Sequence, residues 1–600
     1  MKLSDYVIDF LVEHGVKHVF MLPGGGAMHL NDSLGKRRTE IEFICNLHEQ
    51  ACSIAAEAYA KFSNQLGVAM VTTGPAGTNS VTGVAGAWLD SMPCLFLSGQ
   101  VKRADIKTGT GVRQLGVQEV DIVSIVQSIT KYAATVLEPE SIRFHLEKAL
   151  HEAKSGRPGP SWIDIPLDVQ AAQIEPEKLN GFSPAESASA ADPKILSKQV
   201  GEVIDLLSRA ERPVIVAGNG IRVAGAVPDF LSAANTIKAP VLTTWLGMDL
   251  LADDHPLFAG RPGAIAPRGA NFALQNSDLM LAIGARLDMA FTGYAHDKLA
   301  RAAAKVIVDV DEAEIRKMKM PLALSVVADA GDFLRELNRQ LQAKSLPGYS
   351  AWLNRCQEWK QRYPVVQEEH RTRESGVSVY YFSEIISAAL AAEDVVVSGS
   401  SGSAIELFLL VFKVKKNQRI FHTRGLGAMG FALPASIGAC LAAGRRRTIC
   451  VDGDGGFQMN IQELETVRRL QLPIKFFVLN NDGYASIRTS QENYFHHLVA
   501  ADGTSGLTLP AVLKVAEAYG LKTARIEKSD NLRKEIDAVL KMEGPVVCEV
   551  IVPSEEQRAP RLSSAQRPDG TMVSKPLEDL FPFLDREEFR ANMLIPTLDE

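Results

Sequence analysis

The stretch Val451-Asp452-Gly453-Asp454-Gly455, followed further along by Asn480-Asn481, decides the fold of the third part of this chain. The Gly-Asp-Gly turn comes after a short apolar run, 448–451, which predicts a strand. A helix is expected over 460–472 and a second apolar strand over 474–479. Because open α/β sheets bind ligands at the carboxyl ends of their strands, the two polar clusters predict one binding site.

The side chains in these clusters are hard oxygen donors. Mg²⁺ prefers octahedral oxygen coordination and keeps some ligands from phosphates and water. Asp454, Asn481 and the carbonyl of Gly483 would leave coordination positions open for a diphosphate. A pair of ordinary turns is the alternative, since Asp-Gly and Asn-Asp-Gly are common turn formers. The paired asparagines at the end of the next strand favour the metal site.

Composition limits the class of protein. Six hundred residues exceed one hydrophobic core, and 46% hydrophobic with 22% charged residues is ordinary for a soluble globular protein. A net charge of −7 argues against nucleic-acid binding. Seven cysteines without a CxxC pair fit a reducing cytoplasm. With no signal-peptide layout and no apolar run of about 18 residues, we expect a cytoplasmic protein without a membrane span.

Helix-like and strand-like segments alternate through most of the chain, which predicts an α/β fold with doubly wound parallel sheets. Residues 181–191, rich in Ser, Ala and Pro, are typical of a linker, and 345–375 are interpreted as a connection. We expect three sheet domains and a C-terminal tail that docks on the body: 1–175, 192–345, 376–553 and 554–600.

Beyond the metal motif, the chain resembles the thiamine-diphosphate enzymes, and within them the acetolactate synthase-like group, over nearly its whole length. The N-terminal match is His48-Glu49-Gln50-Ala51, where the family has a glutamate that protonates the aminopyrimidine ring of the cofactor. A carboxylic acid in a desolvated pocket has a raised pKa and can share that proton. The alternative for Glu49 is a first-turn glutamate favoured by the helix dipole. The resemblance implies pyrimidine-binding, central FAD-type and diphosphate-binding domains, in that order.

Further segments resemble the cofactor-binding loops of the family. Gly425–Gly430 resembles the pyrimidine clamp, in which the Gly427 carbonyl and Met429 hold the ring, and methionine suits an irregular gap. Gly399–Ser403 resembles the diphosphate loop. A packed helix start and a flexible loop are the respective alternatives. The resemblance assigns to thiamine diphosphate Gly25, Gly399, Ser400, Ser401, Gly427, Met429, Gly453, Asp454, Gly455, Gly456, Asn481, Gly483 and Tyr484, with Mg²⁺ on Asp454, Asn481 and Gly483.

The reacting side of the site involves the first domain. A glycine loop at 23–27 lies where the family approaches the reacting carbon, although a plain turn is equally compatible with three glycines. Thr73–Asn79 resembles the family's Ser/Thr-Gly-Pro segment. Gln118 resembles a catalytic glutamine, and Val117 replaces the phenylalanine before it, which predicts a roomier pocket. With Glu49, we interpret Gln118 and His29 as catalytic candidates, and a structural role for His29 is equally compatible.

The middle domain resembles the flavin-binding domain of the same group. An arginine and backbone N–H groups can bind the FAD diphosphate, and an acidic residue at a strand end can bind ribose hydroxyls. The alternative is a vestigial nucleotide domain that keeps the shape without the ligand. FAD would be structural, because the net reaction transfers no electrons. The candidate residues are Gly218, Asn219, Gly220, Thr244, Gly263, Gly284, Arg286, Asp288, Asp309 and Asp329.

The chain departs from acetolactate synthases at two further positions. Those enzymes carry Asp-Asp-Arg after Gly-Ala-Arg, and the last arginine grips the carboxylate of the second keto acid. Here the segment is Asp288-Met289-Ala290, and Ser490 stands where they have a tryptophan. Losing a buried guanidinium partner for a carboxylate costs a few kcal/mol, on the order of 1–3. A neutral or larger ketone is therefore expected as the acceptor.

This pattern resembles the smaller subgroup that transfers an acetyl unit from pyruvate to a ketone, such as the enzyme of yersiniose A branched-sugar biosynthesis, whose acceptor is a nucleotide-linked 4-keto-deoxysugar. Alternatives are an acetolactate synthase, cyclic-diketone cleavage, a flavin-linked oxidation or an inactive scaffold. The presence of Glu49, Asp454 and Asn481 argues against the last. The resemblance also implies a homodimer at least, and a homotetramer, because the family's cofactor lies between two subunits.

Overall fold

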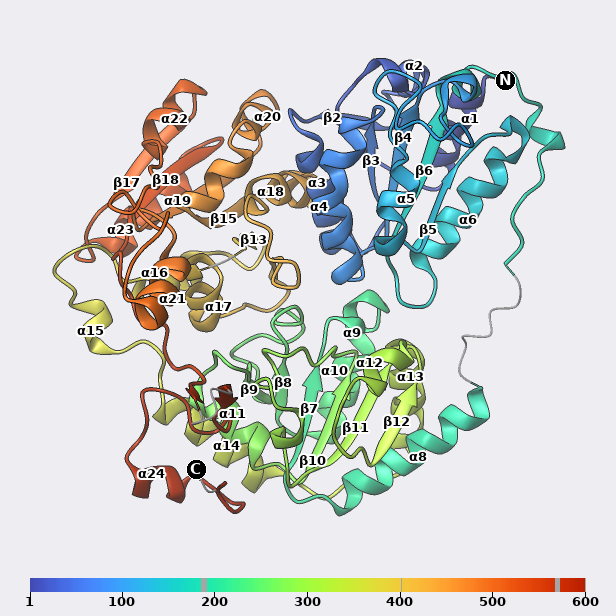
Figure 1. The fold of residues 1–600 in the computed structure, drawn as a ribbon. Coiled ribbons are helices and arrows are strands. Elements are labelled where there is room, and N and C mark those ends of the chain that lie inside the picture. The colour runs from blue at the N-terminus through green and yellow to red at the C-terminus, as the bar shows by residue number, and fades with distance from the viewer. Residues whose placement is uncertain (185–191, 401, 567–571, 599–600) are drawn as a thin grey trace.

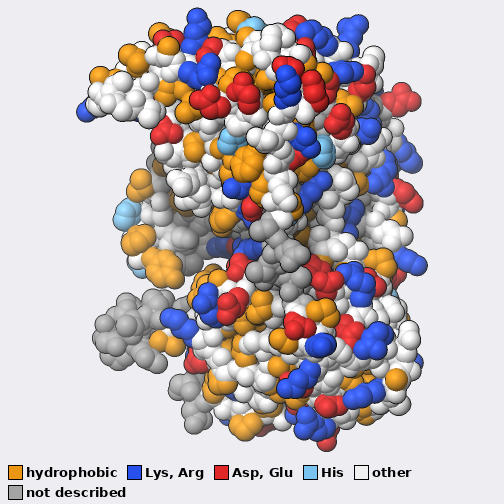
Figure 2. Space-filling model, turned by 90° about the vertical axis from the view of Figure 1, so that its right-hand side faces the viewer, with side chains coloured by type: hydrophobic (Ala, Val, Ile, Leu, Met, Phe, Trp, Pro, Cys, Tyr) orange, Lys and Arg blue, Asp and Glu red, His pale blue; other side chains and the backbone are white. Residues whose placement is uncertain are grey.

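The computed structural model describes residues 1–184, 192–400, 402–566 and 572–598. Three domains, each built on a six-stranded parallel sheet with helices on its faces, are arranged around a common centre (Figure 1). The predicted fold class is confirmed. Figure 2 shows positive and negative side chains interspersed over one face, and a notch between the upper domains and the middle domain. Within the described ranges, every helix is too short or too polar to cross a membrane.

The first domain has the strand order β2-β1-β3-β4-β6-β5. Its central strands are buried on both faces and accordingly are nearly continuous apolar runs. The strands are β1 (His18–Met21), β2 (Glu42–Cys45), β3 (Gly67–Val71), β4 (Cys94–Gln100), β5 (Tyr132–Thr135) and β6 (Pro160–Pro166). The helices are α1 (Leu3–Glu13), α2 (Met28–Lys36), α3 (Glu49–Ser63), α4 (Pro75–Leu89), α5 (Ile122–Val126), α6 (Ile142–Lys154) and α7 (Leu167–Gln170), with a 3₁₀ turn η1 (Gly25–Ala27).

The second, middle domain has the order β12-β11-β10-β7-β8-β9. Its strands are β7 (Pro213–Ala217), β8 (Val241–Thr243), β9 (Phe258–Gly260), β10 (Leu279–Ile283), β11 (Ala304–Asp309) and β12 (Leu324–Val327). Its helices are α8 (Pro193–Arg209), α9 (Gly220–Val223), α10 (Val227–Ile237), α11 (Arg268–Gln275), α12 (Glu312–Arg316) and α13 (Ala330–Leu341).

The segment interpreted as a connection, 345–375, holds more structure than expected. It forms α14 (Ser350–Arg362) and the short α15 (Glu368–Arg371). Trp352, Cys356 and Trp359 recur at helical spacing and are buried against the middle domain, where Trp359 lies beside Phe272. The apolar stripe therefore makes most of this segment part of the middle domain's core.

The third domain has the order β14-β13-β15-β16-β18-β17. The helix expected over 460–472 is shorter, because a 3₁₀ turn, η8 (Gln458–Asn460), precedes it. The strands are β13 (Val395–Ser398), β14 (Arg419–Phe421), β15 (Thr448–Gly453), β16 (Ile474–Asn480), β17 (Lys522–Ile526) and β18 (Val546–Ile551). The helices are α16 (Val379–Ala389), α17 (Glu406–Val411), α18 (Ala432–Ala442), α19 (Asp454–Phe457), α20 (Glu463–Arg469), α21 (Ala485–Phe495), α22 (Val512–Ala518) and α23 (Leu532–Lys541).

The first and third domains share one apolar core through α3 and α18, which face each other in Figure 1. The two backbones approach so closely that a Cβ built on Gly438 would lie 2.0 Å from the carbonyl oxygen of Ala55. Only glycine fits at such a crossing, so this contact sets how the two domains are oriented.

The C-terminal tail runs from the third domain to the middle domain (Figure 1). It contains β19 (Ser564–Gln566) and β20 (Met572–Ser574), which pair in antiparallel fashion, and α24 (Arg586–Ala591). Asn271 Nδ2 donates to the Leu577 carbonyl at 2.7 Å, and Trp359 Nε1 donates to Asn592 Oδ1 at 2.8 Å. These buried hydrogen bonds anchor the tail to the middle domain.

Candidate active site

The third domain carries a buried carboxylate at the carboxyl end of its central strands. Asp454 begins α19 directly after β15, and its carboxylate accepts hydrogen bonds from Gly455 N at 2.8 Å and Gly483 N at 3.1 Å. Burial raises the pKa of Asp454 to about 6 despite these bonds. Beside it, the buried Asn481 Oδ1 has no hydrogen-bond partner among the described residues. An oxygen-binding cation would satisfy both groups, so the pair fits the predicted magnesium site.

The protein supplies few charged ligands here. Within the described residues, no group of three or more His, Cys, Asp or Glu side chains gathers in a way that could hold a metal. A cation on Asp454, Asn481 and the Gly483 carbonyl must therefore complete its coordination with oxygens from another molecule, as the predicted diphosphate would provide.

Two of the predicted glycines of this edge lie against a second carboxylate, that of Asp452. A Cβ on Gly399 or Gly456 would lie 2.5 or 2.7 Å from Asp452 Oδ1. Burial raises the pKa of Asp452 to about 7. Our sequence interpretation did not single out Asp452, although it stands inside the motif, because its role depends on the two glycine loops packing around it.

Two of the remaining loop glycines, Gly455 and Gly483, are equally confined. A Cβ on Gly455 would lie 2.3 Å from the ring of Tyr484, and Gly483, at φ 135°, would clash with the Ala501 carbonyl. Gly453 has open space around it. Ser401, assigned to the diphosphate loop, lies outside the described residues.

The predicted pyrimidine clamp lies next to the diphosphate loop. Gly427 has φ 69°, and its ideal Cβ position lies 3.7 Å from the Ser400 carbonyl oxygen. Met429 follows two residues later and is half-buried. Asn460 Nδ2 donates to the Gly430 carbonyl at 2.8 Å and to Gln50 Oε1 of the first domain at 3.1 Å. This asparagine, which our sequence interpretation missed, links the clamp to the start of α3.

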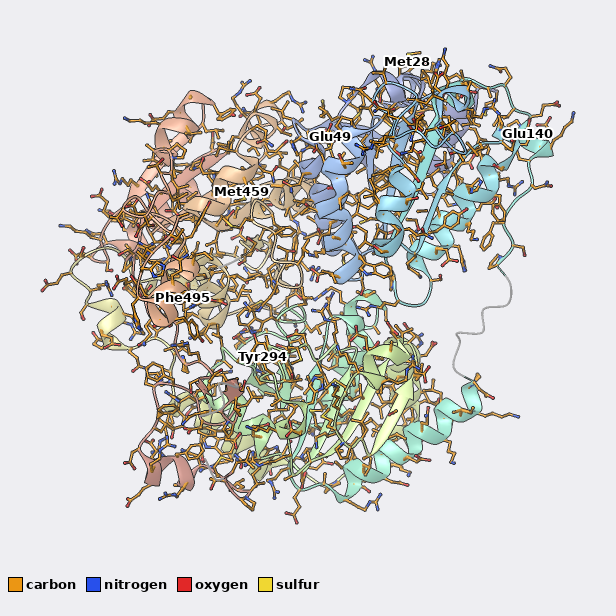
Figure 3. All side chains as sticks on the ribbon, in the orientation of Figure 1. Met28, Glu49, Glu140, Tyr294, Met459 and Phe495 are labelled. Carbon is orange, nitrogen blue, oxygen red and sulfur yellow. The ribbon has the colours of Figure 1, made fainter. Side chains whose placement is uncertain are left out.

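Glu49 is the first residue of α3 and is 9% exposed, so its carboxylate lies in a largely desolvated position (Figure 3). The His48 side chain caps the helix by accepting from Gln50 N at 3.0 Å. Asn79 Nδ2 of α4 donates to Glu49 Oε2 at 2.9 Å. The Thr73–Asn79 segment indicated a helix start, but only the packing of α4 on α3 shows that Asn79 orients the glutamate.

The other first-domain candidates lie at the same sheet edge. A Cβ on Gly74 would lie 2.1 Å from the Gln118 carbonyl oxygen, so the Gln118 loop rests on the turn before α4. Gln118 and Gly25 are exposed, and His29 in α2 is half-buried. Val117, the replacement for the family's phenylalanine, is 86% exposed.

Nine of the ten predicted flavin residues line one cavity of about 860 Å³, a volume in the range of small-molecule sites. Gly218 lies behind the wall, where a Cβ would be 2.1 Å from the Gly284 carbonyl oxygen. The cavity extends to Ser400 and Gly402 of the third domain, and Asp90 of the first domain forms part of its wall. The nine residues are Asn219, Gly220, Thr244, Gly263, Gly284, Arg286, Asp288, Asp309 and Asp329.

Some of these residues also have roles within the protein. Asp288 Oδ1 accepts from Ala290 N at 2.9 Å and Phe291 N at 3.1 Å, and Asp329 caps α13. Arg286 Nη1 donates to the Leu89 carbonyl at 3.1 Å. Burial raises the pKa of Asp309, whose carboxylate accepts from Asp311 N. The cavity is thus a preformed cleft at the carboxyl ends of the middle sheet's strands.

The candidate residues fall into separate groups. The cavity of the middle domain reaches Ser400, but Glu49, Asp454 and Asn481 are not among its lining residues. In Figure 3, Glu49 lies at the boundary of the first and third domains, whereas Tyr294 projects from the middle domain toward the centre.

Two sheet edges carrying a buried glutamate and a buried Asp-Asn pair match the class of thiamine-diphosphate enzymes. Models of the thiamine pyrophosphate enzyme domains match all three parts of the chain: the N-terminal binding domain over residues 1–125, the central domain over 200–337 and the C-terminal binding domain over 399–550. The chain belongs to the thiamine pyrophosphate enzyme family. The prediction of a thiamine-diphosphate-dependent enzyme that forms carbon–carbon bonds is confirmed at the level of this family.

Within that family, the chain is similar to acetolactate synthases along most of its length. It is 32% identical to an acetolactate synthase large subunit of Cyanidium caldarium, covering 93% of this chain and 94% of the relative. Acetolactate synthase 1, chloroplastic, of Nicotiana tabacum is also 32% identical, covering 94% and 83% respectively. A probable acetolactate synthase large subunit of Methanocaldococcus jannaschii is 32% identical, covering 93% of both chains.

Proposed function

We propose that this enzyme decarboxylates pyruvate and adds the remaining two-carbon acetyl unit to a ketone. The acceptor would be a neutral or larger ketone, such as a nucleotide-linked 4-keto-deoxysugar in branched-sugar biosynthesis. The enzyme would thus belong to the acetyl-transferring subgroup that it resembles.

The observation that carries the proposal is the apolar segment Met289–Ala290 on the cavity wall. Met289 is 47% exposed, and Ala290 stands where the acetolactate synthases that the chain resembles have an arginine. A methyl group cannot replace the fork of N–H donors that binds a carboxylate. Arg286, the charged neighbour of this segment, donates to the Leu89 carbonyl and lies 4.0 Å from Asp288.

A second observation supports a roomier pocket. Ser490, which replaces a tryptophan of the synthases, is exposed on α21, and its hydroxyl donates to the Ser486 carbonyl at 2.9 Å. Its side chain therefore fills little of the space next to α21. Ile487 on the same helix is 44% exposed, so the neighbouring surface is partly apolar.

The roles of the residues follow from their positions. Glu49 would hold and move the proton of the aminopyrimidine ring, with Asn79 orienting it. Asp454, Asn481 and Gly483 would hold Mg²⁺, and Gln118 and His29 would orient the acceptor. Thiamine diphosphate, when bound, supplies the electron sink for decarboxylation.

The cavity residues fit FAD in a structural role. Gly218 and Gly220, after β7, pack directly against Gly284, after β10. Because none of the three has a side chain, the cleft at the carboxyl ends of these strands stays open. Arg286 would face the flavin diphosphate, and Asp309 would face a ribose. Absorbance of the purified protein near 450 nm, unchanged on anaerobic addition of pyruvate, would support a bound flavin outside the redox chemistry; bleaching would favour an oxidase.

The resemblance to the family supports a homodimer at least, or a homotetramer, in which each cofactor lies between two subunits. Analytical ultracentrifugation with both cofactors tests this. A fully active monomer would contradict it. The proposed compartment is the cytoplasm.

The acceptor is tested by supplying pyruvate alone and pyruvate with cyclohexanone. We expect the acetyl adduct of the ketone to form faster than acetolactate. Efficient acetolactate formation with the ketone untouched would favour the second candidate, an acetolactate synthase, which the 32% identity to such enzymes supports. In a separate assay, cleavage of a supplied cyclic diketone would favour the third candidate, an enzyme that cleaves cyclic diketones.

A further inference from the structure

The third-domain end of the cavity contains an ion cluster whose charged residues are assigned to neither proposed cofactor. Arg424, Arg558 and Glu406 line this end together with Ser400, Gly402 and Ser486. Glu406 bridges both arginines, at 2.5 Å from Arg558 Nη1 and 3.5 Å from Arg424 Nη1. Two guanidinium groups share one carboxylate, so the cluster carries one net positive charge.

Other acids near this end have partners within the protein. Asp90, on the first domain's wall of the cavity, pairs with the buried Lys61 at 2.7 Å, and Lys61 also pairs at 2.6 Å with Glu57, whose pKa burial raises to about 7. Asp288 lies toward the middle-domain end and accepts backbone N–H groups. An anion entering this end of the cavity would therefore meet a cationic surface.

Both arginines are held in place by contacts away from Glu406. The Arg424 guanidinium lies over the ring of Trp245, 4.4 Å from its centroid, and its backbone N–H donates to His422 Nδ1 at 3.0 Å. The buried Tyr380 hydroxyl lies 2.8 and 2.9 Å from the carbonyl oxygens of Gln557 and Ala559, on either side of Arg558, and it also accepts from Ala559 N at 2.7 Å. Preorganised donors lose little entropy when they bind a ligand.

Each guanidinium has donors to spare. An arginine carries five N–H donors, and the described contacts of each guanidinium with acceptors use only the Nη1 directed at Glu406. The side chains are 29% and 21% exposed, and both line the cavity. Two arginine forks around a space that also holds the Ser486 hydroxyl can donate to the three terminal oxygens of a phosphate, whereas a carboxylate offers only two oxygens.

We propose that Arg424 and Arg558 bind a phosphate or diphosphate group of the acceptor, remote from its ketone. The inference rests on the proposed carboligation and names the chemical class of its acceptor. It is compatible with the apolar Met289–Ala290 segment, because that segment disfavours a carboxylate attached directly to the ketone. Arg424 lies three residues before Gly427 of the clamp, so a phosphate held there lies within a short molecule's reach of the cofactor-binding loops.

The test compares dihydroxyacetone phosphate with dihydroxyacetone, two acceptors that differ only in the phosphate. The holoenzyme, with thiamine diphosphate, Mg²⁺ and FAD, receives pyruvate and either ketone, and the ratio of the two kcat/KM values is measured. We expect the ratio to exceed ten and to fall at least tenfold in Arg424→Gln and in Arg558→Gln. Glu406→Gln frees both arginines, so it should raise the ratio, a change that general structural damage would not produce.

The matched control is Arg561→Gln, in the same tail, since Arg561 packs on the Phe581 ring rather than lining the cavity. We expect this variant to keep the wild-type ratio. With the unmodified enzyme, glycerol 3-phosphate, which has no ketone, should compete with dihydroxyacetone phosphate. This measurement needs no variant to fold.

Three outcomes would overturn the phosphate site: an unchanged ratio in both arginine variants, a preference for the remote carboxylate of levulinate over the phosphate, or loss of FAD or thiamine diphosphate affinity in place of acceptor affinity. None of these three outcomes would contradict the proposed carboligation if neutral ketones still react. Absence of product from both dihydroxyacetone and cyclohexanone would remove the proposed function, and this site with it.

Discussion

The first and third domains present their functional residues at the same place, the carboxyl edge of a parallel sheet, but in different electrostatic states. Glu49 in the first domain has a hydrogen-bond donor in Asn79. Asp454 in the third domain is buried with a pKa raised to about 6, beside an unpartnered Asn481 oxygen. The sheet edge of the first domain is therefore assembled by the protein alone, whereas we propose that a cation completes the sheet edge of the third domain.

This difference separates two ways to disable the enzyme. Substitutions at the sheet edge of the first domain should abolish proton transfer and leave the cofactor bound. Substitutions at the sheet edge of the third domain should abolish cofactor binding and leave the folded protein as stable as before, or more stable.

The largest expected effect is on turnover in Glu49→Gln. The amide cannot exchange a proton with the aminopyrimidine ring, so kcat should fall by about 10²–10⁴-fold. Thiamine diphosphate binding, followed by fluorescence quenching, should persist. Glu140→Gln, at an exposed position of the first domain, is the control and should keep its activity. Full activity of Glu49→Gln would remove this residue from the mechanism.

A second prediction concerns the crossing of α3 and α18, which joins the first and third domains. Gly438→Val places side-chain atoms against the Ala55 carbonyl, so α3 and α18 must separate at a cost of about 3 kcal/mol. Chemical denaturation measures the loss of unfolding free energy. Gly35→Ala, in α2 with open space around it, should be neutral or stabilising. Equal stability of the two variants would show that the crossing tolerates a side chain.

The third prediction uses pH. The folded-state pKa of Asp454 is raised from 3.8 to about 6, so its protonated form favours the fold and that stabilisation is lost as pH rises from about 4 to 6. The shift corresponds to at most about 3 kcal/mol. Without cofactors, Asp454→Asn should therefore gain stability relative to wild type between pH 5 and pH 7.5.

Saturating Mg²⁺ and thiamine diphosphate should reverse this order at pH 7.5, because only the wild-type carboxylate binds the cation. Denaturation curves at both pH values, with and without the cofactors, check both halves of the prediction. A variant stabilised by the cofactors as much as wild type would place the metal elsewhere.

The smallest effect is expected for Asn79→Ala. Removing the donor leaves Glu49 in place but less well oriented, so kcat should fall about tenfold, as for a lost hydrogen bond to a charged group. Asn79→Asp should be worse than Asn79→Ala, because a second carboxylate would repel Glu49. If both variants keep wild-type kcat, the 2.9 Å contact has no role in orienting the glutamate.

The fold and both sheet edges could be predicted because strand-ending motifs are local in sequence. Gly-Asp-Gly after one strand and Asn-Asn after the next had to meet at one edge once the strands were parallel. Asp452, Asn79 and Asn460 could not be assigned roles in this way. Their contacts depend on how helices and loops pack, and neither spacing nor residue type reports that packing.

The same limit explains the differences in secondary structure. The 460–472 helix begins later because Asn460 turns toward Gly430 and Gln50. Within 345–375, the Trp352 to Trp359 stripe was legible as a buried helix face, but the charged residues around it suggested a connection. The arginines of the proposed phosphate site come from distant parts of the chain, and only the folded protein brings them to one cavity.

The C-terminal tail connects the third domain to the middle domain and could be exchanged between related enzymes as one segment. Arg558 at its start lines the cavity, while Leu577 and Asn592 further along are fastened to the middle domain. Grafting the tail of a related enzyme, with its anchoring residues matched, would replace part of the proposed acceptor pocket without changing the sequence of the thiamine-diphosphate-binding loops. Related enzymes with this fold could therefore differ in acceptor specificity through changes in the C-terminal tail alone.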